Sequence, residues 1–301
     1  MINGQEPRPM TGILWMLVTG LCFVAVTALV KWMGPGMPPS QAAFLRYMLG
    51  MVFLIPMLKD VREANLTPRQ WKLFTLRGLL HSVGVSLWFF AMTRIPIAEL
   101  TAINYLAPVF VSIGAAIFLG ERLAARRIFA VVVALVGTAI ILRPGFREVA
   151  NGHIAMLAAA AVFSGSYLLA KILSDEAKPT VVVFMMTVFV SLGLAPLAAI
   201  VWVTPTWEQI GILALVAVFA QAGHYTMTLA FAAAPVTVTQ PITFLQLVWA
   251  TLLGMLVFGE PVDIYVVLGG VLILASVTFI TWREAQLKRR PITPTINATK
   301  V

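Results

Sequence analysis

Histidine, amide, tyrosine and tryptophan side chains interrupt long apolar stretches of this chain of 301 residues. Such groups donate and accept hydrogen bonds and offer flat rings, so together they suit the binding of a small polar or aromatic molecule. Within 97–119, the spacing i, i+3, i+4 places Thr101, Asn104 and Tyr105 on one helical face. The comparable groups in three other stretches are His81, Ser82 and Trp88; Gln221, His224 and Tyr225; and Thr243, Gln246 and Trp249.

Two further assignments each leave two roles open. His81 lies near the middle of its stretch, and an imidazole can change charge near neutral pH, so it is either a proton-coupling group or a neutral hydrogen-bonding partner. Arg46 lies within 40–58. Its guanidinium either binds a substrate carboxylate through two hydrogen bonds or has a structural role, paired with Glu99 or extended to the lipid headgroups.

The stretches that carry these groups are long and almost uncharged. Hydrophobic residues make up 60% of the chain and charged residues 11%, against about 45–50% and about 25% in a soluble domain. Lipid cannot satisfy backbone N–H and C=O groups, so such runs must be helices, and the alternating polarity of barrel strands is absent. We predict an all-α polytopic membrane protein with ten transmembrane helices, at 10–30, 40–58, 72–93, 97–119, 127–142, 153–173, 180–202, 208–232, 236–258 and 263–282.

The ten predicted helices form two copies of one unit. Phe23 matches Phe163, 140 positions later, and Gly84 matches Gly223, 139 positions later. Five helices per copy is an odd number, so the second copy lies upside down, as in the inverted-topology repeats of many secondary transporters. The predicted regions are an N-terminal tail (1–9), a first repeat (10–148), a second repeat (149–282) and a basic C-terminal tail (283–301).

Positive charge predicts the orientation of the chain. With the N-terminus inside, 15 of the 21 Lys and Arg residues fall in cytoplasmic segments and four fall outside. Since Lys and Arg accumulate on the cytoplasmic side, we expect an inner-membrane protein with both termini in the cytoplasm. The net charge of +9 is then explained by topology and by contact with anionic lipid, and no nucleic-acid partner is indicated.

Motifs of several other function classes are missing. The sequence contains no phosphate-binding loop and no H-E-x-x-H or C-x-x-C metal spacing. Apart from Glu208 and Asp263, each the first residue of its span, the predicted helices contain one acidic residue, Glu99, so they lack the paired acids of an intramembrane enzyme. We predict a transporter with no catalytic residues, cofactor or metal site, whose partners are a small-molecule substrate and the lipid bilayer.

Several short motifs resemble a known family. They are Phe44-Leu45-Arg46-Tyr47, the run from Ala91 through Pro96 to Pro108, and the paired endings Gly120-Glu121 and Gly259-Glu260. With these motifs the chain is similar to EamA-type proteins of the drug/metabolite transporter superfamily, and among them to the YddG-type exporters of aromatic and other neutral amino acids. The resemblance implies export by alternating access around a central cavity, with the fifth and tenth helices as peripheral braces.

The expected function is therefore export of small metabolites, with neutral or aromatic amino acids as preferred substrates. A transporter of phosphorylated metabolites or small organic drugs is the alternative, although Arg46 and Arg77 are few for binding phosphate. A membrane scaffold without transport is the alternative from another class, but it would not require polar stripes in both halves. Because proline removes a backbone hydrogen bond, the predicted bending points are Pro96, Pro108, Pro235 and Pro241.

Overall fold

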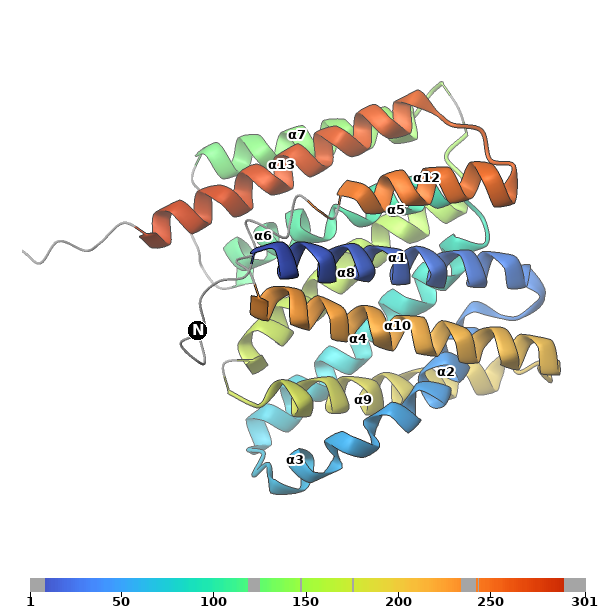
Figure 1. Ribbon diagram of the computed structural model, residues 1–301, viewed down its shortest axis with the longest axis vertical. Helices are drawn as coiled ribbons and strands as arrows, with labels where there is room; N and C mark the ends of the chain where they lie inside the picture. Colours follow the sequence, from blue (N-terminus) through green and yellow to red (C-terminus); the bar gives the residue numbers. More distant parts are fainter. Residues whose placement is uncertain are drawn as a thin grey trace, which may run out of the picture.

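The computed structural model describes residues 9–118, 125–146, 148–174, 176–233, 242 and 244–289. The elements in these ranges are helices (Figure 1). In chain order they are α1 (Pro9–Met33), η1 (Gly34–Gly36), α2 (Pro39–Gly50), η2 (Met51–Met57), α3 (Leu58–Glu63), α4 (Pro68–Met92), α5 (Ile97–Asn104), α6 (Ala107–Phe118), α7 (Ala125–Leu142), α8 (Asn151–Ser174), α9 (Pro179–Ile200), α10 (Trp207–Ala233), α12 (Phe244–Phe258) and α13 (Ile264–Arg289).

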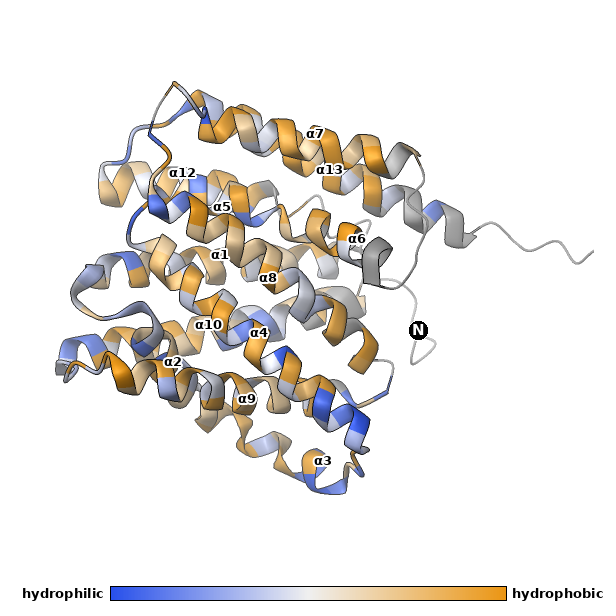
Figure 2. Ribbon diagram, turned by 180° about the vertical axis from the view of Figure 1, so that it is seen from behind, coloured by the Kyte–Doolittle hydropathy of each residue, from blue (hydrophilic) through white to orange (hydrophobic). Residues whose placement is uncertain are grey.

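The helices confirm a polytopic all-α membrane fold. Within the described ranges, six helical segments are long and apolar enough to cross a bilayer. Four shorter apolar helical segments lie at 97–111, 128–142, 245–258 and 264–280, inside the remaining predicted spans. Figure 2 shows that most of the bundle is hydrophobic along its length, with hydrophilic residues along α4.

Two of the predicted spans are not single helices. The second changes from α2 to the 3-10 helix η2 at Met51, and η2 contains Pro56. The fourth is interrupted at Tyr105 and Leu106, directly before the helix that contains Pro108, whose missing N–H cannot continue the α-helical pattern. The break between α5 and α6 therefore lies just before Pro108, and the bend predicted at Pro108 stays a prediction.

The other predicted bending points have different outcomes. Pro96 precedes α5 as its N-cap and does not bend a helix. Pro235 and Pro241 lie outside the described residues.

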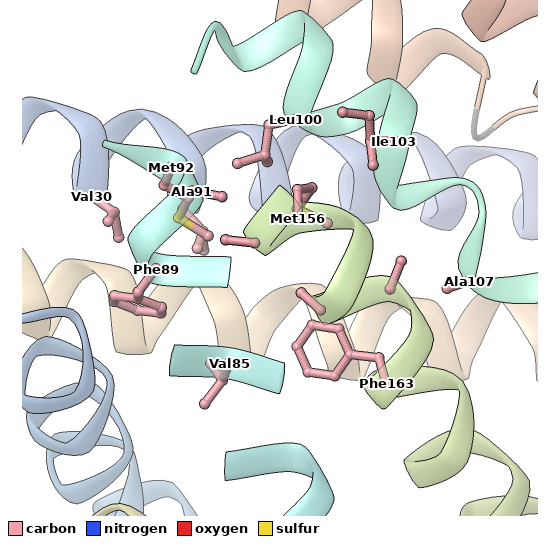
Figure 3. Close-up of a cluster of buried hydrophobic side chains, with 14 of the residues drawn as sticks. Val30, Val85, Phe89, Ala91, Met92, Leu100, Ile103, Ala107, Met156 and Phe163 are labelled. Carbon is pink, nitrogen blue, oxygen red and sulfur yellow. The ribbon is translucent and has the colours of Figure 1, made fainter. Parts of the chain in front are cut away.

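Helices of one repeat pack against helices of the other, and these contacts follow a pseudo-twofold pattern. Helix α4 of the first repeat packs against α8 and α9 of the second, and α10 of the second packs against α1 and α2 of the first. Each pairing therefore has a counterpart in which the repeats are exchanged. The core shown in Figure 3 lies at this junction, where Val85, Phe89, Met156 and Phe163 from α4 and α8 are buried together.

Ion pairs gather at the two ends of the bundle. At one end, Arg69 pairs with Glu176 and Lys178 pairs with Asp60, so that α3 and the start of α4 are joined to the segment between α8 and α9. At the other end, Arg143 pairs with Asp263 and Lys31 pairs with Glu260, in the segments that follow α7 and α12. In Figure 1, α1 begins and α13 ends at the same end as α3, and the segment after α7 lies at the opposite end, as an inverted repeat requires.

Helices α7 and α13 lie side by side at one edge of the bundle (Figure 1). Their backbones come close at two glycines, since neither has a side chain to hold them apart. A methyl group on Gly137 would lie 2.7 Å from the carbonyl oxygen of Gly269. Ser276 also donates a hydrogen bond to the carbonyl oxygen of Ala130. Helix α13 continues to Arg289, so the first residues of the region predicted as a tail (283–301) are helical.

Candidate substrate-binding site

Two histidine rings in the interior of the bundle each lie against a phenylalanine of the other repeat. The His81 ring of α4 is 4.9 Å from the Phe163 ring of α8. The His224 ring of α10 is 5.2 Å from the Phe23 ring of α1, at an interplanar angle of 80°. Since Phe23 and Phe163 are equivalent in the duplication, both repeats contribute one wall ring and one imidazole to the same region.

His81 is held by polar groups from two neighbouring helices. Its Nδ1 lies 3.2 Å from the hydroxyl of Ser166 on α8, and its ring meets the Tyr47 ring of α2 edge-on at 6.4 Å. Only 7% of His81 is exposed. The Ser166 contact shows His81 in a hydrogen bond between helices, and its role in proton coupling stays a prediction.

Two arginines lie next to the histidines. The guanidinium carbon of Arg46 is 4.1 Å from the centre of the Tyr47 ring. Arg77 lies one helical turn before His81 on α4, and its Nη1 donates to the carbonyl oxygen of Val182 at 3.1 Å. Both guanidinium charges are near enough to act on His81 and on His224. The interior of the bundle is therefore electropositive.

The expected pairing of Arg46 with Glu99 is wrong. Glu99 of α5 pairs with His153 at the start of α8, and both residues are buried. No ion pair joins Arg46 to any carboxylate in the described part of the chain. Its guanidinium is instead placed over an aromatic ring, which attracts a cation through the negative face of the ring.

The buried face of α8 opens into accessible space towards the end of this helix. Met156, Ala160 and Phe163 define that face, and each is 5% exposed or less. Tyr167 follows Phe163 by four positions and stacks on it at 6.0 Å with an angle of 20°, yet Tyr167 is 46% exposed. Tyr167 is thus the accessible residue of this face, and its ring is stacked on the ring that contacts His81.

The structure brings together some of the predicted site residues and separates others. His81, His224 and Arg46 meet at the centre, and Gln221 lies one turn before His224 on α10, half-buried. Trp88 is also half-buried, and its Nε1 has no hydrogen-bond partner among the described residues. Asn104 is half-buried at the end of α5.

Three predicted site residues are used for packing between or within helices. The Ser82 hydroxyl lies within hydrogen-bond distance of the carbonyl oxygens of Gly78 and Val190, at 2.8 and 3.2 Å. The Thr101 hydroxyl donates to the carbonyl oxygen of Ile97 at 2.8 Å. Tyr105 is 9% exposed, next to the main chain of Leu247. In this structure these groups therefore contribute to helix packing.

The remaining predicted residues lie away from the centre. Tyr225 is 65% exposed and shares a face of α10 with the exposed Val218. Trp249 is 37% exposed in a stripe of α12 with Leu245, Leu252 and Leu256. Gln246 packs against Gly20 of α1, with 3.7 Å between its Cβ and a Cβ built on that glycine. Thr243 lies outside the described residues.

Sequence reasoning missed a group of central residues: Tyr47, Arg77, Phe163, Ser166 and Tyr167. Two signals were present. Arg77 precedes His81 by four positions, which puts both on one helical face. Phe163 is the repeat partner of Phe23, so a matched aromatic pair was visible in the duplication.

This arrangement defines a class of protein, a helical membrane protein with two interlocked repeats and a polar, aromatic centre between them. Rings, imidazoles and guanidinium groups converge there, while no group of three metal-binding side chains occurs among the described residues. The chain belongs to the EamA-like transporter family, whose model matches residues 10–143 and again 150–282.

Relatives with known roles transport different small molecules. A riboflavin transporter of Rhizobium johnstonii is 30% identical, with 95% of this chain and 96% of that protein covered. An S-adenosylmethionine uptake transporter of Rickettsia bellii is 24% identical, with coverage of 93% and 97%. A pseudopaline exporter of Pseudomonas aeruginosa is 24% identical, with coverage of 88% and 94%. This chain is thus a multi-pass membrane transporter of small metabolites.

Proposed function

We propose that this transporter carries a small metabolite with a planar aromatic ring system, and that riboflavin is the first substrate to test. The observation that carries the proposal is the set of rings at the centre, in which Phe163 stacks on Tyr167 and contacts His81, with Phe23 and His224 as counterparts. Aromatic walls of this kind stack on a flat substrate ring. The similarity to a riboflavin transporter over almost the whole chain supports the same choice.

Alternating access around this centre is the proposed mechanism. The ion pair between Lys31 and Glu260 joins α1 to the segment after α12 at the predicted outer end. Tyr167, which is 46% exposed, lies in the later part of α8, towards the opposite end. A centre that is closed at one end and accessible from the other is what one state of an alternating-access cycle requires.

Export of aromatic amino acids is the second candidate. A benzyl or indole side chain can stack on the Phe163 and Tyr167 rings as a flavin ring does. The two candidates differ in size and in hydrogen bonding, so a substrate panel separates them. The panel also determines direction, since relatives include proteins named for uptake and for export.

The test is flux in proteoliposomes that contain the purified protein. Riboflavin, phenylalanine, tryptophan, leucine, S-adenosylmethionine and a cationic dye are supplied in turn, inside or outside the vesicles. We expect saturable riboflavin flux above that of protein-free vesicles, with phenylalanine or tryptophan as the alternative positive result. Flux of the cationic dye or leucine alone would contradict a site built for planar aromatic metabolites.

A further inference from the structure

Arg46 and Arg77 are two buried cations that form no ion pair with any Asp or Glu in the described part of the chain. Each is only 7% exposed. The described Asp and Glu residues that form ion pairs do so with other cations, namely Lys31, Arg69, Arg143, His153 and Lys178. A charged side chain inside a membrane is costly unless a partner compensates it, and such residues usually face a cavity or a substrate path.

The hydrogen-bonding capacity of both guanidinium groups is only partly used. Arg77 donates to the carbonyl oxygen of Val182 and contacts the sulfur of Met186 at 3.3 Å, but its buried Nε has no partner among the described residues. Arg46 stacks on Tyr47 and donates no hydrogen bond to any described residue. A guanidinium carries five N–H donors, so several donors remain for a ligand.

The two arginines face one region. Tyr47 is next to both, since its ring lies under Arg46 and its hydroxyl is near the charge of Arg77. Tyr167, which is partly exposed and stacks on Phe163, is also near Arg77. Arg46 and Arg77 come from α2 and α4, and the facing helices α8 and α10 contribute rings and imidazoles but no carboxylate in this region.

We infer that Arg46 and Arg77 form an anion-binding subsite beside the aromatic walls, so that the site prefers ring-containing molecules that also carry a carboxylate or phosphate group. Guanidinium groups bind both oxyanions through paired, charge-assisted hydrogen bonds. This inference rests on the proposed function and narrows the substrate of the same site. Two arginines are few for binding phosphate, but both are available to one oxyanion, because neither forms an ion pair with a carboxylate among the described residues.

The test compares ligands that share a ring and differ in one anionic group. The pairs are riboflavin 5′-phosphate with riboflavin, and phenylalanine with phenylalaninamide, each measured as a competitor and as a transported substrate in proteoliposomes. We expect the anionic member of at least one pair to bind about tenfold more tightly to the unaltered protein, as charge-assisted hydrogen bonds imply. Arg46→Gln and Arg77→Gln should each reduce this preference and leave the affinity for the member without the carboxylate or phosphate unchanged.

Matched variants separate charge recognition from folding. Arg69→Gln removes an exposed arginine that pairs with Glu176 and should leave the preference intact. Arg77→Lys keeps the charge and should retain part of it. If Arg77→Gln does not fold, Arg46→Gln and Arg77→Lys still decide the matter. Equal binding of both members of every pair by the unaltered protein, or equal weakening of both by Arg46→Gln, would overturn the inference.

A second measurement detects anion binding at the subsite without a transport assay. Inorganic phosphate and sulfate should raise the thermal unfolding midpoint of the detergent-purified protein and should raise it less in Arg46→Gln, while chloride at equal ionic strength serves as the control. If no aromatic compound is transported but the oxyanions stabilise only the unaltered protein, the proposed function fails and the anion subsite stands. If riboflavin is transported and neither oxyanion has an effect, the subsite fails and the function stands.

Discussion

Gly84 of α4 lies against the ring of Phe163 of α8, so closely that a methyl group on Gly84 would come within 2.7 Å of Phe163 Cδ1. The equivalent pair in the other repeat makes a looser contact, since a methyl group on Gly223 would lie 3.4 Å from Phe23 Cε2. Each repeat thus packs one glycine against one of the two wall rings, Phe163 and Phe23. The two equivalent contacts differ in how tightly the glycine meets the ring.

Gly84→Ala is expected to destabilise the protein by about 1–3 kcal/mol, because an added methyl group in a filled core forces neighbours to shift. Gly223→Ala should cost less, about 1 kcal/mol or below, since the nearest atom to its methyl group, Cys22 Cβ, would be 3.3 Å away and a shift of a few tenths of an ångström relieves the contact. Thermal unfolding in detergent measures both. Equal loss of stability in the two variants would show that the contacts are not the cause.

Phe163→Leu keeps an apolar side chain but removes the ring that stacks on Tyr167. If a planar substrate stacks there, its KM should rise about 2- to 10-fold, as the loss of about 0.5–1.5 kcal/mol of ring interaction implies. Phe129→Leu is the matched control, because Phe129 is 67% exposed on α7. A KM that changes equally in both variants would argue against Phe163 as part of the site.

Glu260→Gln is expected to loosen the predicted outer end. Glu260 pairs with Lys31, and its Oε2 accepts a hydrogen bond from the N–H of Ile97 at 2.9 Å, while Lys31 donates to the carbonyl oxygen of Ile95 at 2.9 Å. Loss of about 1–2 kcal/mol from this connection would raise the open population about 5- to 30-fold.

The measurement is cysteine labelling from outside with a membrane-impermeant maleimide. Thr251→Cys lies in the pocket that Glu260 lines, and Cys22, the one native cysteine, is buried and gives the background. Labelling should be faster when Glu260→Gln is added. Asp263→Asn, which removes the partner of Arg143 at the same end, is the control and should have a smaller effect. No acceleration by Glu260→Gln would remove this pair from the closure of the outer end.

Gly269→Ala should separate the edge helices α7 and α13 because the new methyl group would meet the carbonyl oxygen of Gly137. We expect a loss of about 1–3 kcal/mol in stability with an unchanged KM, since the centre of the site lies on other helices. Gly211→Ala has no neighbour within 4 Å and serves as the control. A changed KM with unchanged stability would contradict the assignment of α7 and α13 as a brace.

The apolar runs and the matched spacing of the two halves were sufficient to predict the helices and their duplication. They could not show where the second span changes to a 3-10 helix, because Met51–Met57 is as apolar as the helix before it. Within the site, helical periodicity grouped residues by face but could not say what each face meets. Two predictions failed for this reason. Tyr225 lies on an exposed face of α10 with Val218, and Glu99 pairs with His153 in place of Arg46.

Helix α13 runs without interruption from Ile264 to Arg289 and leaves the bundle as a straight rod. A carrier of 301 residues is a small particle for electron cryomicroscopy. Joining a larger soluble protein in helical register after Arg289 would give it a rigid marker for particle alignment, at a position far from the rings at the centre of the bundle.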